Sequence, residues 1–109
     1  MTELKAMDTA KSVNGIAIRL TQERWVHIVE NHCELAGSFY DVLEAVASPD
    51  IILEGTNDKE LLAVKKREGK KHLVVIYKEL STQDGFVITA FISSKISKLL
   101  RRQIVWKQE

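Results

Sequence analysis

The chain is poor in the residues that disulfide and metal frameworks need. Of its 109 residues only one is cysteine, Cys33, and only one is proline. A lone cysteine excludes a disulfide within the chain, fits a reducing compartment, and leaves no thiolate set for a structural zinc site. No apolar run approaches the roughly 20 residues that span a membrane, and residues 1–14 lack the apolar core of a secretory signal. We therefore expect a cytoplasmic protein that does not enter a membrane.

The sequence also lacks a glycine-rich phosphate-binding loop, which argues against nucleotide hydrolysis of the P-loop kind. Its composition is otherwise typical of a globular protein, with 45% hydrophobic and 28% charged residues. The length suits one domain with a single core. We predict that residues 15–109 form this domain. Residues 1–14, which are polar and unpatterned, are predicted to be a flexible lead-in.

Charge is unevenly distributed along the chain, although its net value is only +1. Residues 1–64 hold 11 acidic and 5 basic side chains, whereas residues 65–107 hold 11 basic and 3 acidic ones. A basic half of this kind can form a face that binds a polyanion, or it can neutralise the acidic half across the fold. Counting charges leaves both interpretations open.

Hydrophobic periodicity predicts an α+β fold. Residues 15–20 alternate as a short strand does, and Thr21 then suits the N-cap of a helix. A second helix follows from Ser38 to Ser48. The remaining segments are predicted to be four strands at 51–55, 61–67, 72–79 and 86–92, a short helix at 96–100 and an edge strand at 104–106. This pattern indicates N-terminal helices followed by an antiparallel meander.

Strand alternation predicts which polar side chains share a face of the sheet. Lys65 and Arg67 alternate with Lys66 in the second strand. In the fourth strand, one set of side chains is wholly apolar and should lie under the helices: Phe86, Ile88, Ala90 and Ile92. The other set should form an open working face: Val87, Thr89, Phe91 and Ser93. Tyr77 joins that face if the hairpin registers permit.

Two of the three histidines lie on the first predicted helix, and histidine is the usual side chain for proton transfer near neutral pH. His32 falls on the apolar stripe with Trp25, Ile28 and Val29, where a histidine more often packs. His27 falls off the stripe and is the stronger candidate of the two. His72 begins a strand and is expected to be structural.

Several segments resemble the phage-associated branch of the barnase, EndoU, colicin E5/D and RelE nuclease superfamily. The most distinctive is Leu20-Thr-x-Glu-Arg-Trp-x-His27-Ile-x-x-x-His32, and segments 46–50, 62–65, 73–77 and 86–95 also match. The resemblance extends over residues 15–107. It implies N-terminal helices packed on a four-stranded antiparallel sheet, with a short C-terminal helix, whose other face holds RNA.

The resemblance implies a toxin-like endoribonuclease that needs no metal and no cofactor and that cleaves RNA by attack of the 2′-hydroxyl on the phosphate. His27 and His32 match the family's helical histidines, Lys65 its strand cation, and Thr89, Ser93 and Ser94 its late hydroxyls. If His32 is buried, it orients the site or only packs, and His27 must act with a residue from the sheet. Together with Tyr77 these are the candidate catalytic residues.

The implied partners are RNA, either tRNA or mRNA, and an acidic antitoxin protein, and a homodimer is also compatible with the sequence. The candidate RNA-binding residues are cations that can reach phosphates over a surface: Lys66, Arg67, Lys95, Lys98, Arg101 and Arg102. Lys70 and Lys71 are more typical of a solvated hairpin tip. Two alternatives remain. A non-catalytic RNA-binding domain would use the same basic face without the histidines, and a partner-binding protein would use neither the basic face nor the histidines.

Overall fold

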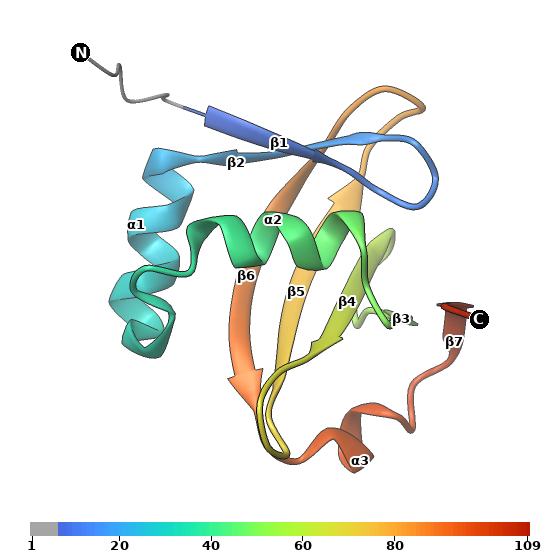
Figure 1. Cartoon of the computed structure of the whole chain (residues 1–109). Helices are drawn as coiled ribbons and strands as arrows, with labels where there is room; N and C mark the ends of the chain where they lie inside the picture. Colours follow the sequence, from blue (N-terminus) through green and yellow to red (C-terminus); the bar gives the residue numbers. More distant parts are fainter. Residues whose placement is uncertain (1–6) are drawn as a thin grey trace.

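The computed structural model describes residues 7–109, which form one mixed sheet and three short helices (Figure 1). The strands are β1 (Met7–Lys11), β2 (Ala17–Thr21), β3 (Ile51–Glu54), β4 (Glu60–Lys66), β5 (His72–Glu79), β6 (Gly85–Ser93) and β7 (Ile104–Lys107). The α-helices are α1 (Gln22–Asn31), α2 (Phe39–Ala47) and α3 (Ile96–Leu99), and a 3₁₀ turn, η1 (Cys33–Leu35), separates the first two. All of these helices are too short or too polar to span a bilayer.

The sheet has seven strands in the order β1-β2-β6-β5-β4-β3-β7. Strands β3 to β6 form the antiparallel meander that the sequence predicts. The expected fold, N-terminal helices on a four-stranded antiparallel sheet, is nevertheless wrong. Three more strands extend the sheet, and β2 pairs with β6 in parallel, through Ile18 with Gly85 and Arg19 with Phe86.

Strand β1 lies within the segment that we expected to be a flexible lead-in. It pairs along its whole length with β2, from Met7 opposite Thr21 to Lys11 opposite Ala17. Its side chains give little periodic signal, because only Ala10 is buried. An edge strand is held by backbone hydrogen bonds on one side, so it can form without an apolar pattern. Residues 1–6 lie outside the described residues.

Helices α1 and α2 cover one face of the sheet, here called the helix face (Figure 1). The hydroxyl of Thr21 accepts a hydrogen bond of 3.0 Å from the Arg24 N–H, so this residue is the predicted N-cap of α1. Ile28 of α1 and four residues of α2 pack on central strand residues, and Trp25 meets Phe39 edge-to-face at 5.4 Å. Each fully buried aliphatic side chain here contributes about 1.5–3 kcal/mol.

A smaller apolar cluster lies on the opposite side, here called the outer face. Its buried members are Leu53, Leu62, Val64 and Val74, and Ile96 and Leu99 of α3 pack against them. Helix α3 therefore covers only part of the outer face. The rest is open at the end of the sheet that carries the β4–β5 turn.

Candidate functional site

The structure divides the predicted catalytic residues between the two faces of the sheet. Lys65 lies opposite Leu73 on the helix face, and its Nζ donates a hydrogen bond of 2.6 Å to the carbonyl oxygen of Ser48 at the end of α2. Thr89 and Ser93 lie on the outer face, opposite Ile76 and His72. The strand cation and the late hydroxyls therefore do not form one site.

Tyr77 does not join the open face. It is fully buried in the core on the helix face, opposite Leu61 and Val87. Burial raises the pKa of its hydroxyl, and the negative charge of Glu79 raises it further. Within residues 7–109 the hydroxyl has no hydrogen-bond partner. Tyr77 is thus placed as a packing residue that holds its proton.

A β-bulge in β6 changes the predicted alternation of that strand. Ile76 lies opposite Thr89, but the next residue, Tyr77, lies opposite Val87, so Ile88 is an extra residue. Val87, Ala90 and Ile92 consequently pack on the helix face. The prediction that Val87 shares a face with Thr89, and that Phe86 shares one with Ala90, is wrong for this reason.

His27 lies on the solvent side of α1, and its side chain is 60% exposed. Its Nδ1 atom is 3.9 Å from Oε2 of Glu30. The shallow hollow beside it is lined by residues of α1 and its N-cap: Thr21, Glu23, Arg24 and Asn31. None of the described residues that line this hollow comes from β4, β5 or β6, so no side chain of these central strands meets His27 there.

His32 ends α1 and is only partly covered, with 34% of its side chain exposed. Its ring lies 6.1 Å from the ring of Phe91 in β6. Its Nδ1 atom is 3.6 Å from Oε2 of Glu34, within ion-pair distance when the imidazole is protonated. His32 is therefore not buried, which was the condition for a role in packing or orientation only. Its ring reaches solvent beside a carboxylate.

Glu34 also lines a hollow of about 660 Å³ on the helix side of the β4–β5 turn, which we call the Arg67 hollow. Its other walls come from the turn and from β6: Arg67, Glu68, Gly69, Lys71 and Ile92. The Nη1 atom of Arg67 is buried and has no hydrogen-bond partner in the described part of the chain. The Arg67 hollow therefore brings the Glu34 carboxylate, which lies beside His32, together with a guanidinium group that has one unpaired nitrogen within residues 7–109.

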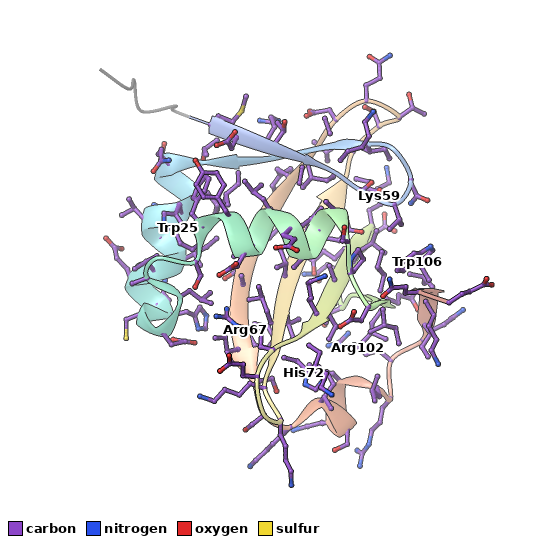
Figure 2. The ribbon with its side chains drawn as sticks, viewed as in Figure 1. Trp25, Lys59, Arg67, His72, Arg102 and Trp106 are labelled. Atoms are coloured by element: carbon purple, nitrogen blue, oxygen red, sulfur yellow. The ribbon has the colours of Figure 1, made fainter. Side chains whose placement is uncertain are left out.

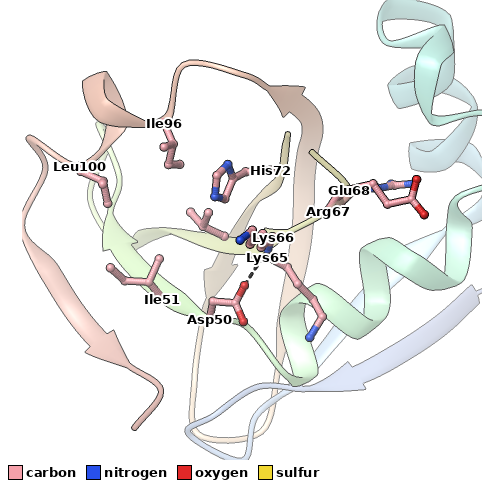
Figure 3. Close-up of a pocket in the computed structure, with 10 residues that line it drawn as sticks. Asp50, Ile51, Lys65, Lys66, Arg67, Glu68, His72, Ile96 and Leu100 are labelled. Atoms are coloured by element: carbon pink, nitrogen blue, oxygen red, sulfur yellow. Dashed lines mark hydrogen bonds between the residues drawn. The ribbon is translucent and has the colours of Figure 1, made fainter. Parts of the chain in front are cut away.

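A second hollow, the His72 depression, opens on the outer face and measures about 900 Å³ (Figure 3). Lys66 and His72 lie opposite each other in β4 and β5, and His72 lies opposite Ser93 in β6. Lysine, imidazole and hydroxyl thus follow one another across three strands on one face. Figure 2 shows that Arg67 and His72 lie at the same end of the sheet.

The remaining candidate cations differ in their surroundings. Lys95, which precedes α3, Lys98 and Arg101 are exposed, as is the hydroxyl-bearing Ser94. The Arg102 guanidinium instead donates hydrogen bonds to the Glu54 carbonyl oxygen at 3.4 Å and to the Thr56 hydroxyl at 2.9 Å. Arg102 therefore fastens the β3–β4 loop, and the other three are free to meet a ligand.

Sequence reasoning identified His32 and Arg67 but missed Glu34 and His72. Glu34 follows the end of α1, and only the 3₁₀ turn η1 brings it beside His32 and towards Arg67. The position of His72 could have been predicted from the sequence. Residues flanking a short hairpin turn face each other, so Lys66 and His72 could have been paired from the turn length.

Comparison of the chain with protein-family models, with curated protein sequences and with solved structures finds no match. Its function is therefore inferred from the geometry of these residues. Across residues 7–109 no group of three or more histidine, cysteine, aspartate or glutamate side chains is arranged to hold a metal ion.

Proposed function

We propose that this protein is a metal-independent ribonuclease that uses His32 and Glu34 as its proton-transfer pair and Arg67 and Lys71 as its phosphate-binding cations. The observation that carries the proposal is the meeting of two features at one hollow. Glu34, 3.6 Å from the His32 imidazole, lines the same hollow as Arg67, whose Nη1 is buried and unpaired within residues 7–109. General acid–base groups and a cation are what RNA cleavage requires.

The proposed reaction is an internal transesterification of RNA. The Glu34 carboxylate takes the proton of the ribose 2′-hydroxyl, and the oxygen attacks the adjacent phosphorus. The bond from phosphorus to the 5′-oxygen breaks as the protonated His32 imidazole donates its proton to that oxygen. The products are a 2′,3′-cyclic phosphate and a free 5′-hydroxyl. The reaction as proposed starts with the proton on the His32 imidazole and none on the Glu34 carboxylate, and it ends with the proton on Glu34 and none on His32.

Arg67 is suited to the charge that develops on the phosphate. A guanidinium group can donate two parallel hydrogen bonds to phosphate oxygens, and its interaction is stronger where water is excluded. Its Nη1 has no protein partner among the described residues but is buried, so the side chain would have to shift for an anion in the hollow to reach that atom. Lys71 lines the same hollow and adds a second positive charge.

Exposed cations beyond the hollow would hold the rest of the RNA strand. Lys66 lies on the outer side of β4, and Lys95, Lys98 and Arg101 lie on and around α3. Contacts of this kind fix the position of a strand without reading its sequence. We therefore propose a cleavage site at the Arg67 hollow and a basic track that extends past the turn.

The test is an RNA cleavage assay with tRNA and mRNA in the presence of EDTA, read out as 2′,3′-cyclic phosphate ends. His32→Asn should slow cleavage by about 10²-fold or more, the size of a general acid or base contribution. His27→Asn is the matched control, because it removes an exposed imidazole from the same helix, and it should cleave at the wild-type rate.

The opposite result, full activity of His32→Asn, would overturn the assignment. Intact RNA combined with tight, salt-sensitive binding would instead indicate a non-catalytic RNA-binding domain. Absence of both cleavage and binding would exclude both nucleic-acid functions.

A further inference from the structure

The His72 depression combines two surfaces of different chemistry. One wall carries the Lys66 ammonium group and the His72 imidazole, which lie opposite each other in β4 and β5. The floor is apolar and is formed by Ile51 and Val64, with Ile96 and Leu100 from the α3 region closing it (Figure 3). The Asp50 and Glu68 carboxylates also line the depression, beside Lys65 and Arg67. A ligand with an anionic group, a hydroxyl donor and a flat or apolar body would complement these surfaces.

His72 has an unused hydrogen-bonding atom at this site. Its Nδ1 atom is buried and has no partner in the part of the chain that the structure describes. A buried polar atom of this kind costs free energy until a partner satisfies it. The neighbouring Lys66 uses its backbone N–H to donate to Oδ2 of Asp50, at 2.6 Å, and leaves its side chain exposed.

Asp50 supplies the acceptor that a sugar requires. Its Oδ2 holds the Lys66 backbone, and its side chain lines the depression. The carboxylate has a second oxygen with lone pairs for a hydroxyl donor. Cation, acceptor and apolar floor thus occur in one hollow of about 900 Å³, within the range of small-molecule sites.

We infer that the His72 depression binds a nucleotide, with the phosphate on Lys66 and His72, the ribose towards Asp50 and the base on the apolar floor. This site is separate from the proposed cleavage site and has a different imidazole. Arg67 lines both hollows, so they lie on either side of the β4–β5 turn. The nucleotide is either a free molecule or one unit of an RNA strand that also occupies the Arg67 hollow. Only the RNA-strand alternative rests on the proposed function.

The experiment is an NMR titration of the ¹⁵N-labelled full chain with inorganic phosphate, ribose 5-phosphate and AMP. AMP should shift the amides of Lys66, His72 and Ile96 and should bind about tenfold more tightly than phosphate, because only AMP covers the apolar floor. Equal affinities for the two ligands, or shifts confined to other residues, would overturn the inference.

Two variants separate the parts of the site. His72→Gln should weaken both AMP and phosphate, whereas Leu100→Ser should weaken AMP alone, and His27→Gln is the unaffected control. Leu100 is 45% exposed, so its replacement leaves the core intact. Loss of AMP binding in His27→Gln, or its retention in both site variants, would contradict the proposed geometry.

An adenosine tetraribonucleotide, titrated into the His32→Asn variant so that the proposed reaction does not consume it, distinguishes the two sources. Tighter binding than AMP, with shifts around Arg67 as well as His72, identifies an RNA strand as the ligand. Weaker binding than AMP identifies a free mononucleotide. Because AMP binding needs no cleavage, failure of the ribonuclease assay and failure of this inference are separate results.

Discussion

The Nζ atom of Lys65 lies 2.6 Å from the carbonyl oxygen of Ser48, the C-cap residue of α2. A lysine at this position donates to a carbonyl at the helix C-terminus and complements the negative end of the helix dipole. Lys65, which the sequence predicted to be the strand cation of the active site, therefore stabilises the end of α2 in the structure.

Replacing Lys65 by Met should lower the free energy of unfolding by about 0.5–1.5 kcal/mol, the usual net value of a hydrogen bond. RNA cleavage should change little, because this amine points to α2 and does not line the Arg67 hollow. Urea denaturation and the cleavage assay measure the two effects. A variant that folds as the wild type does but no longer cleaves RNA would show that Lys65 is catalytic.

Tyr77→Phe should be as stable as the wild type or slightly more stable. The hydroxyl is buried without a partner among residues 7–109, so its removal takes away a desolvation cost and no hydrogen bond. Tyr77→Ala is the contrasting variant and should lose about 3–5 kcal/mol through the cavity it leaves. Thermal unfolding of both variants tests this, and a large loss in Tyr77→Phe would reveal a partner for the hydroxyl.

Arg67→Met should move stability and RNA binding in opposite directions. The buried, unpaired guanidinium nitrogen costs free energy in the unliganded protein, so an apolar side chain of similar length should leave the protein equally or more stable. RNA affinity should fall, and the slope of log K against log salt should decrease by about 1. Arg102→Met, which breaks contacts to the β3–β4 loop, should destabilise the protein and leave the slope nearly unchanged.

The ion pair between Arg19 and Asp84 predicts a pH dependence of stability. The guanidinium donates hydrogen bonds of 2.8 and 3.1 Å to the two carboxylate oxygens, which lowers the pKa of Asp84 below its ordinary value of 3.8. The pair therefore stabilises the folded protein above that pH and is lost as the pH falls through the lowered pKa.

Asp84→Asn should be less stable than the wild type near neutral pH, and the difference should shrink below about pH 4. Urea titrations of both proteins at neutral pH and at about pH 3 measure it. A difference that stays constant over this range would show that Asp84 stabilises the fold by some other contact.

Gly85→Ala should destabilise the parallel junction between β2 and β6. A Cβ atom at this position would lie 2.6 Å from Cδ1 of Ile18 and closer still to the carbonyl oxygen of Lys78. The expected loss is about 1–3 kcal/mol, the range for overpacking, with Gln83→Ala in the adjacent exposed turn as control. If Gly85→Ala has the wild-type free energy of unfolding, β2 and β6 can move apart enough to accommodate the methyl group without loss of stability.

Local signals were sufficient for most elements of the fold. The apolar stripe of α2, the Thr21 N-cap and the alternation in β4 and β5 are properties of neighbouring residues, and the structure confirms them. The extra residue at Ile88 is not such a property, because a bulge is defined by the partner strand. The parallel pairing of β2 with β6 joins residues more than 60 positions apart and depends on the space beside Gly85.

The sequence by itself determined the helices, the central meander, and the presence of His32 and Arg67 as candidate chemical groups. Periodicity and capping act over a few residues, so they can be read without a fold. Only the tertiary structure decided the seven-stranded mixed sheet and the placing of Lys65 and Tyr77 among structural contacts. It also brought Glu34 beside His32 and His72 beside Lys66, because such neighbours are created by a turn and a strand register that packing selects.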